Sequence, residues 1–301
     1  MHVRSQPKLY TVHHKRDIHL EPFKALFTPI HAGAALSTED LGILRDDSGD
    51  NISAKNRNYC ELTAIYWIWK NTTDDYVGLM HYRRIFVRPS RRQKLADLRE
   101  FLRFTLRIAK SALGLRDKRI IFRRQRRMTS HTTFSELGRD LVDYFRENPP
   151  RFGAALPPPE WVHGKSQREL HSIDHFPEDF DLFFETLVRL YPDMKPFLRQ
   201  LDVSVDLRMR NMFIFRRDIF DIYCERLFAT LFEMENKVDL SGYSEAQARI
   251  YGYLSEYYMS VFVSFMKARD GLDLLDLPIM NYIGVQTGRP TPRPVPRTQA
   301  V

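Results

Sequence analysis

The sequence predicts an α/β protein with one mainly parallel sheet, and three observations support this prediction. Short apolar runs alternate with a helix-length stretch of period 3.6 along the first 86 residues. The chain has 301 residues and 43% hydrophobic content, which is enough to bury the core of one large domain. Three of the expected strands also end in polar or basic residues, where ligands usually bind in such sheets.

The expected elements follow one another in a simple order. Strands are expected at residues 8–14, 27–33, 76–80 and 211–215. Between the second and third strands, Asn51 and Ser53 are suited to begin a helix. Its buried face would consist of Leu62, Ile65, Tyr66 and Trp69. Further helices are expected at residues 94–113, 179–190, 218–234 and 243–267, and the alternation indicates a Rossmann-like sheet flanked by helices.

The strand at residues 76–80 leads directly into a basic motif. The residues that follow it are His81, Tyr82, Arg83 and Arg84. Taken alone, this motif is equally well explained as a basic surface turn. However, His14 and Lys15 end the first strand and His31 ends the second, so a shared parallel sheet would gather all of them along one edge. Fixed cations at that edge favour the binding of a negatively charged ligand.

The positive charge of the chain is concentrated in one segment. Between residues 91 and 127, 14 Lys and Arg outnumber 3 Asp and Glu, which gives a net charge of +11. Because the whole chain carries +8, the remainder carries −3. This concentration argues against a general nucleic-acid-binding fold, in which cations would be spread over a docking face.

The basic segment contains an expected amphipathic helix at residues 94–113. Its apolar stripe consists of Leu95, Leu98, Leu102, Leu106, Ala109 and Leu113. Its cationic flank consists of Arg99, Arg103, Arg107 and Lys110. Such a helix suits an anionic membrane surface, and we expect residues 91–127 to make that contact. The alternatives are a helix packed on the domain with a solvated basic edge, and RNA binding, for which aromatic residues are sparse.

Histidines and carboxylates are dense between residues 161 and 192. They are His163, His171, Asp174, His175, Asp179 and Asp181. Their spacing matches no zinc signature, so we interpret the segment as a loop followed by a helix with an acidic first turn. One of its carboxylates is a candidate general base. Farther along, Arg249 and Glu256 are two turns apart, so each needs a partner elsewhere.

Several features limit the class of protein. Cys60 and Cys224 lie in apolar helical patterns, which indicates buried thiols in a reducing compartment. No stretch is apolar enough for a membrane span, and the start resembles no cleaved secretion signal. Residues 287–301 are proline-rich and cationic with nothing to bury, so we expect one domain over residues 1–286 and a disordered tail.

Six stretches of the sequence resemble stretches of a known protein family, and they occur in the same order as in that family. They are YTVHHK, FTPIHAGAAL, DDSGDNISAKNRNYCELTAIYWIWKN, DYVGLMHYRRIF, NMFIFRRDIFDIYCERLF and QARIYGYLSE. The chain resembles the bacterial glycosyltransferases of domain of unknown function 4422, which occur in capsule, exopolysaccharide and O-antigen clusters. Residues 88–130 look like a basic helical insertion into this pattern. Phe180 stands where the family has a tryptophan, which weakens any role carried over to Asp179 or Asp181.

The resemblance implies a GT-A-like fold, a single Rossmann-type sheet with an acceptor-binding half. In that fold the corresponding strand usually ends in Asp-x-Asp, which holds a divalent metal on the sugar diphosphate. Here it ends in His81 to Arg84, and guanidinium groups can neutralise a diphosphate directly. We therefore expect a metal-independent enzyme. The alternative is that Asp46, Asp47 and Asp50 hold manganese or magnesium.

Site residues follow from the resemblance and from their place in these stretches. The expected donor-binding residues are His14, Lys15, Asp50, Asn51, Asn56, His81, Tyr82, Arg83, Arg84, Asn211, Gln247, Arg249 and Glu256. Asn211 is included by analogy with other GT-A enzymes, and Gln247, Arg249 and Glu256 by sequence pattern alone. The expected catalytic bases for the acceptor hydroxyl are Asp179 and Asp181, with Asp174 behind them.

Together, these expectations describe a cytoplasmic glycosyltransferase bound peripherally to the inner face of the cytoplasmic membrane. It would move a hexose from a nucleotide diphosphate sugar, most simply a UDP sugar, to a glycan or lipid-linked acceptor, and would bind no nucleic acid. The alternative is a non-catalytic basic module that binds an anionic polymer or a membrane surface.

Overall fold

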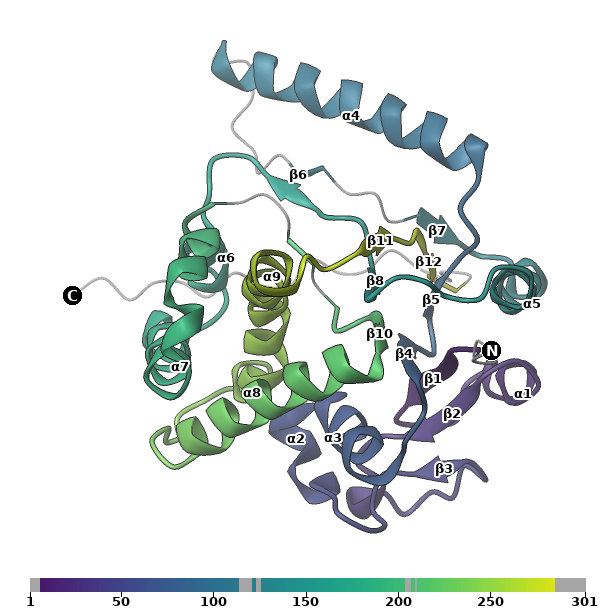
Figure 1. The fold of residues 1–301 in the computed structure, drawn as a ribbon, viewed down its shortest axis with the longest axis horizontal. Coiled ribbons are helices and arrows are strands. Elements are labelled where there is room, and N and C mark those ends of the chain that lie inside the picture. Colours follow the sequence, from purple (N-terminus) through teal and green to yellow (C-terminus); the bar gives the residue numbers. More distant parts are fainter. Residues whose placement is uncertain (1–5, 114–120, 123–125, 204–206, 209, 285–301) are drawn as a thin grey trace.

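The computed structural model describes residues 6–113, 121–122, 126–203, 207–208 and 210–284 (Figure 1). Its main sheet has the strand order β11-β8-β10-β4-β1-β2-β3. These strands are β1 Lys8–His13, β2 Thr28–His31, β3 Leu44–Arg45, β4 Tyr76–His81, β8 Ala154–Leu156, β10 Phe213–Arg216 and β11 Leu274–Asp276. Three more strands extend it, β5 Arg84–Phe86, β7 Arg126–Met128 and β12 Ile279–Tyr282. A separate pair is formed by β6 Ile121–Phe122 and β9 Trp161–Val162.

Helices connect and cover these strands. The α-helices are α1 Leu20–Lys24, α2 Asn56–Tyr59, α3 Leu62–Asn71, α4 Arg91–Ala112, α5 His131–Glu147, α6 Gln167–His171, α7 Pro177–Leu190, α8 Arg217–Glu235 and α9 Ile250–Asp270. Short 3₁₀ segments are η1 Ala34–Leu36, η2 Ser53–Lys55, η3 Pro192–Asp202 and η4 Gln247–Arg249. No helix in the described part of the chain is both long and apolar enough to cross a bilayer.

The centre of the sheet is parallel, as the sequence predicts. Strand β1 pairs in parallel with β2 on one side and with β4 on the other. In this register Val12 lies opposite Ile30 and His81, and His13 lies opposite His31. The carboxyl ends of the three strands therefore share one edge, which confirms the expected gathering of their polar ends. Strand β10 is antiparallel to β4 and β8, so the sheet is mixed and mainly parallel.

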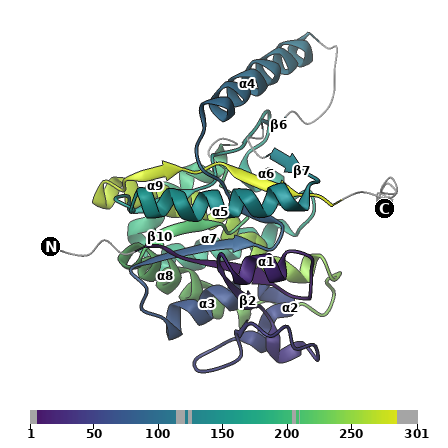
Figure 2. The ribbon, with the colours of Figure 1, turned by 90° about the vertical axis from the view of Figure 1, so that its right-hand side faces the viewer.

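Strict alternation along the strands builds a core on each face of the sheet. Tyr10, Val12 and Leu79 pack with α3, α7, α8 and α9, whereas Leu9 and Met80 pack with α1 and α5 on the other face. Figures 1 and 2 show these two groups of helices on opposite sides of the strands. The sheet is thus covered on both faces, and only its edges and strand ends are open to a ligand.

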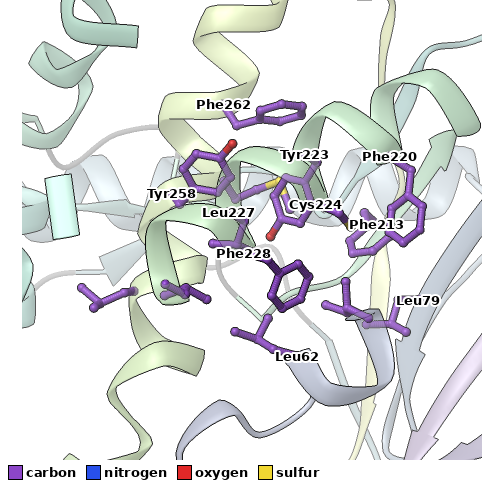
Figure 3. Packing of buried hydrophobic residues seen from close by; sticks show 14 of the residues in the cluster. Leu62, Leu79, Phe213, Phe220, Tyr223, Cys224, Leu227, Phe228, Tyr258 and Phe262 are labelled. Carbon is purple, nitrogen blue, oxygen red and sulfur yellow. The ribbon is translucent and has the colours of Figure 1, made fainter. Parts of the chain in front are cut away.

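The larger core contains several fully buried tyrosines (Figure 3). Among the described residues, nothing hydrogen-bonds the buried hydroxyl groups of Tyr223 and Tyr258. Leaving such a group unpaired costs about 1–3 kcal/mol. We therefore expect Tyr258→Phe to leave the free energy of unfolding in urea unchanged or raised. The adjacent Phe262→Ala should lower it by about 3–5 kcal/mol, because it opens a cavity. A clear destabilisation by Tyr258→Phe would show that the hydroxyl group is satisfied.

The helix expected from Asn51 or Ser53 is not continuous, and this prediction is wrong. It is split into η2, α2 and α3, and the break lies at Cys60, whose φ is 53°. The side-chain amide of Asn56 donates to the carbonyl of Cys60 (2.7 Å), which satisfies a group that a continuous helix would have used. Cys60 is therefore half-buried in a turn, whereas Cys224 is fully buried in α8, and both thiols are free.

The basic segment forms the expected helix, α4, which begins and ends close to the predicted bounds. It lies outside the body formed by the sheet and the other helices (Figures 1 and 2). The helices expected at residues 179–190, 218–234 and 243–267 appear as α7, α8 and α9. The last begins seven residues later than expected, at Ile250, after a turn and η4. The predicted tail at residues 287–301 lies outside the described residues.

Candidate active site

The basic motif after β4 forms the turn of a β-hairpin. His81 pairs with Arg84 across β4 and β5, so Tyr82 and Arg83 make the two-residue turn. The backbone N–H of Tyr82 donates to the carbonyl of Val12 (3.1 Å), which ties this turn to the end of β1. Arg83 is exposed at the turn, whereas Arg84 is half-buried. Arg83 is therefore surrounded by solvent, whereas Arg84 lies partly inside the protein.

The exposed part of this edge is a basic rim made of His14, Lys15, Tyr82 and Arg83. The ring of Tyr82 lies 5.2 Å from that of His14, and the guanidinium of Arg83 lies 4.8 Å from the Tyr82 centroid. Partial burial and the charges of Lys15 and Arg83 lower the pKa of His14, which favours the neutral imidazole. Among the described residues, no carboxylate lies within ion-pair distance of Lys15 or Arg83. The rim therefore offers an anion two cations that no described carboxylate neutralises.

Beneath the rim lies a polar centre to which four parts of the chain contribute. Its members are Glu61, His81, Arg84, Arg210, Asn211 and Glu256. His81 Nε2 donates to the carbonyl of Arg210 (2.6 Å), so the end of β4 holds the segment that precedes β10. The Asn211 amide donates to Glu61 Oε1 (2.8 Å), and its carbonyl accepts from Ser255 Oγ (3.0 Å). Asn211 thereby joins the start of α3 to the second turn of α9.

The polar centre contains a carboxyl group that can exchange a proton near neutral pH. Burial, followed by the charge of Glu61, raises the pKa of Glu256 to about 7. The guanidinium groups of Arg210 and Arg84 and the Arg210 backbone N–H oppose this rise without cancelling it. Burial and the neighbouring Arg210 lower the pKa of Arg84, and burial lowers the pKa of His81. Perturbed groups of this kind cluster at functional sites.

The backbone around the polar centre is strained. Cys60, Arg210 and Asn211 have φ values of 53°, 93° and 47°, and no other non-glycine residue in the described part of the chain has a positive φ. Such conformations cost about 1–3 kcal/mol each and persist where the surroundings enforce them. Two of these residues supply atoms to the polar centre, and the third precedes Glu61. This coincidence makes the region the candidate functional site.

A small cleft opens beside Glu256. Its lining residues are Cys60, Glu61, Arg249, Gly252, Tyr253 and Glu256. Arg249 Nε donates to Cys60 Sγ (3.1 Å) at the mouth, and a Cβ on Gly252 would meet Cys60 Cβ at 3.3 Å. The space is about 40 Å³. Pockets that enclose a small-molecule ligand usually measure about 300–1,000 Å³, so most of a bound sugar would lie outside this cleft.

Several residues expected at the donor site have other positions. Asp50 accepts from Tyr66 Oη (3.0 Å), and its backbone N–H donates to Asn71. It therefore lies near the C-terminal end of α3, whereas Glu61 lies at the N-terminal end. Asn51 donates to the carbonyl of Gly49 in the same turn (3.0 Å). The structure therefore does not bring Asp50 or Asn51 to the polar centre. Asn56 reaches it indirectly, through its hydrogen bond to Cys60.

The carboxylates that could supply a metal site are already occupied. Asp46 is buried and accepts from the backbone N–H groups of Gly33 (2.8 Å) and Ala34 (3.0 Å) and from Ser53 Oγ (2.5 Å). Asp47 is paired with Arg45, whose guanidinium lowers the pKa of Asp47. Within the described ranges, no group of three His, Cys, Asp or Glu side chains is arranged to hold a metal ion.

The expected catalytic bases lie on and before α7 and are not among the residues that line the cleft. Asp179 is buried, accepts from Tyr243 Oη at both oxygens (2.9 Å each), and burial raises its pKa. Asp181 is paired with Arg168, and Asp174 lies in the turn before α7. His175 approaches the cleft, since its ring lies 4.3 Å from that of Tyr253.

Gln247, in η4, is also engaged locally. Its Oε1 accepts from the Ser244 backbone N–H (3.2 Å) and Oγ (2.9 Å), so it caps a turn before α9. Of the three residues chosen by pattern at the start of α9, only Arg249 and Glu256 line the cleft. The segment thus contributes Arg249, the last residue of η4, and Glu256, in the second turn of α9.

Sequence reasoning missed Glu61 and Arg210. Glu61 follows Cys60 in what reads as a continuous helix, so nothing marks it as facing a site. Arg210 directly precedes Asn211, which was expected at the site, and a buried pairing with Glu160 (2.5 Å) gives it a fixed position. Arg210 could have been identified as a charged residue next to the site candidate Asn211, at the start of a buried strand.

Comparisons with known proteins agree with this architecture. The apo structure of the bifunctional glycosyltransferase WbbM is similar with a TM-score of 0.71 at 23% sequence identity, over 96% of this chain and 48% of that chain. The chain thus spans about half the length of that protein. This likeness confirms the GT-A-like α/β fold. No curated protein matches significantly. The family model described as domain of unknown function DUF4422 matches residues 8–146 and 151–267, a range that includes the basic segment, and the chain therefore belongs to that family.

Proposed function

We propose that the chain is a glycosyltransferase that moves a hexose from a nucleotide diphosphate sugar, most simply a UDP sugar, to an acceptor hydroxyl group. The proposal rests mainly on the arrangement of charged groups at one edge of the sheet. At the carboxyl edge of β1 and β4, the cations Lys15 and Arg83 lie above a centre that contains Glu256, whose pKa burial raises to about 7. Membership of a family that shares its fold with a bifunctional glycosyltransferase supports this assignment.

The diphosphate of the donor would bind at the basic rim. Lys15 and Arg83 can pair with a phosphate because no described carboxylate lies within ion-pair distance of them. Arg84 lies one residue farther along, below the turn, where burial strengthens its interaction with a leaving phosphate. The ring of Tyr82, between His14 and Arg83, offers an apolar surface for the nucleoside.

The chemistry would take place at the mouth of the cleft. An acceptor hydroxyl group enters beside Glu256, and its oxygen forms a bond with the anomeric carbon of the donor sugar. The bond from that carbon to the diphosphate oxygen breaks, and the nucleoside diphosphate leaves with its charge held by Arg84 and the rim. The hydroxyl proton passes to the carboxylate of Glu256, whose pKa of about 7 suits a general base at neutral pH.

The acceptor and pathway follow from the family resemblance and not from the site. We infer a glycan or lipid-linked acceptor in capsule, exopolysaccharide or O-antigen synthesis, at the inner face of the cytoplasmic membrane. Because the cleft is small, most of the acceptor would lie on the protein surface near Tyr253 and Arg249.

Transfer should not require a divalent metal. The rim and Arg84 supply the positive charge that a metal otherwise provides, and Asp46 and Asp47 are occupied by internal donors. We therefore expect turnover of a nucleotide sugar in EDTA to stay within about twofold of turnover in manganese. Loss of activity in EDTA and its recovery with manganese would contradict this expectation.

The activity itself is tested by incubating the full chain with a panel of UDP, GDP and ADP sugars and measuring nucleoside diphosphate release, with and without glycan acceptors. The proposal predicts release from at least one donor. If none is turned over and none binds, the non-catalytic basic module, which would bind an anionic polymer or membrane through residues 91–127, becomes the better account.

A further inference from the structure

Helix α4 carries two separate apolar faces, of which one is exposed. On the inner face, Phe101, Phe104 and Ile108 pack against Phe122 and Trp161. The outer stripe consists of Leu95, Leu98, Leu102, Leu106 and Leu113, each 54–74% exposed. A helix held on its inner face needs no second apolar stripe for folding. The outer stripe therefore requires another explanation.

The outer stripe is bordered by positive charge. The helix contains seven Lys and Arg against Asp97 and Glu100. On a helical wheel, four cations lie side by side along one border of the outer stripe, and these are Arg99, Arg103, Arg107 and Lys110. Arg103 and Arg107 approach Glu100 only at 3.5 and 3.8 Å in exposed pairs, so they stay available to an external anion.

We propose that this outer face of α4 docks on the anionic surface of a lipid bilayer. The leucines would enter the boundary between head groups and acyl chains, and the adjacent cations would meet lipid phosphates, two contributions that add for such helices. A soluble polyanion would use the cations but would leave the leucines in water. A second copy of the chain would bring two like-charged flanks together.

The position of α4 suits this role. It lies outside the body in both views, so a flat surface can reach its outer stripe (Figures 1 and 2). It begins at Arg91, five residues after β5 ends at Phe86, and β5 begins with Arg84 of the polar centre. Docking would therefore hold the active edge close to the bilayer, within reach of an acceptor that is anchored there.

The test uses the full chain and sedimentation with vesicles. We expect binding to phosphatidylcholine vesicles that contain roughly one third phosphatidylglycerol, and binding about tenfold weaker or less to pure phosphatidylcholine. The variant Leu98→Gln/Leu102→Gln/Leu106→Gln should lose about tenfold or more in binding to the anionic vesicles. Because these side chains are exposed, its circular dichroism should match that of the unmodified chain. Ile18→Gln, at an exposed apolar residue outside α4, is the matched control and should bind normally.

Three results would overturn the proposal. The first is an absence of binding to anionic vesicles. The second is leucine-variant binding equal to that of the unmodified chain, which would indicate a charge-only contact with any polyanion. The third is a concentration-dependent dimer that the leucine substitutions dissolve while vesicle binding persists, which would assign the stripe to a second copy. None of these readings depends on glycosyl transfer, so failure here leaves the proposed activity untouched.

Discussion

Replacing Glu256 with Gln is expected to lower kcat of transfer by about 10²–10⁴-fold, the usual contribution of a general base. The substitution keeps the shape of the side chain but removes the carboxylate that would accept the acceptor proton. In the unmodified protein, activity should rise with pH through about 7, where Glu256 loses its proton. The variant should lack this limb in its pH–rate profile, measured from nucleoside diphosphate release across pH 5.5–9.

The same substitution should not weaken the fold. Because the folded state raises the pKa of Glu256 to about 7, the native protein binds more protons than the unfolded chain between the ordinary glutamate pKa and pH 7. Stability is therefore lost as pH rises through this range, by up to about 3 kcal/mol above pH 7. Gln at this position removes the burial of a charge, so the free energy of unfolding at pH 8 should be equal or higher.

Two further variants test which carboxylate is the catalytic base. Glu235→Gln alters a partly buried carboxylate that binds Lys55 and Tyr59 outside the cleft, and its activity should be normal. Asp179→Asn tests the base expected from the sequence. If Asp179→Asn abolishes transfer with an intact fold while Glu256→Gln does not, the base lies on α7 and Glu256 does not accept the acceptor proton.

Replacing Arg84 with Gln is expected to lower kcat/KM for the donor by about 10²–10³-fold, because a buried guanidinium stabilises the charge that develops on the leaving diphosphate. Arg83→Gln, at the exposed turn, should act mainly through KM and by about tenfold. The difference in size follows from the burial of Arg84 and the exposure of Arg83. Initial rates over a range of donor concentrations separate the two effects.

A matched arginine provides the control for these variants. Arg216 is exposed at the opposite end of β10 and pairs with Asp218, so Arg216→Gln should leave both kcat and KM unchanged. Since Arg84 lies among other charges, the fold of Arg84→Gln must be checked by thermal unfolding. A folded Arg84→Gln protein with normal kcat/KM would remove this residue from the donor site.

Much of the fold could be predicted from the sequence because its strands and long helices have clear periods. The polar ends of β1, β2 and β4 also predict one shared edge, and the parallel register confirms it. The break at Cys60 could not be predicted. Local propensity favours a helix through this position, and the positive φ is enforced by contacts with Asn56 and α9, the latter distant in sequence.

The site was predictable to the extent that it depends on strand ends. The motif at residues 81–84 and the pair His14 and Lys15 lie at the edge that the strand pattern predicts. The carboxylates were not predictable in this way. Glu61 and Glu256 are far apart in sequence and come together through contacts of the folded chain, among them the hydrogen bonds of Asn211 with Glu61 and Ser255. The acidic residues of α7 are conspicuous in the sequence, but acidic residues are favoured in the first turn of any helix because they interact well with its dipole.

The most direct test of the central claim, that this edge of the sheet holds a nucleoside diphosphate, is calorimetric titration in EDTA. The protein is titrated with UDP, GDP, ADP and the matching nucleosides, and the best ligand is then titrated into Arg83→Gln/Arg84→Gln. We expect one diphosphate to bind at least about tenfold more tightly than its nucleoside, and the double variant to lose this preference. Failure of every diphosphate to bind, or equal binding by the folded double variant, would contradict it.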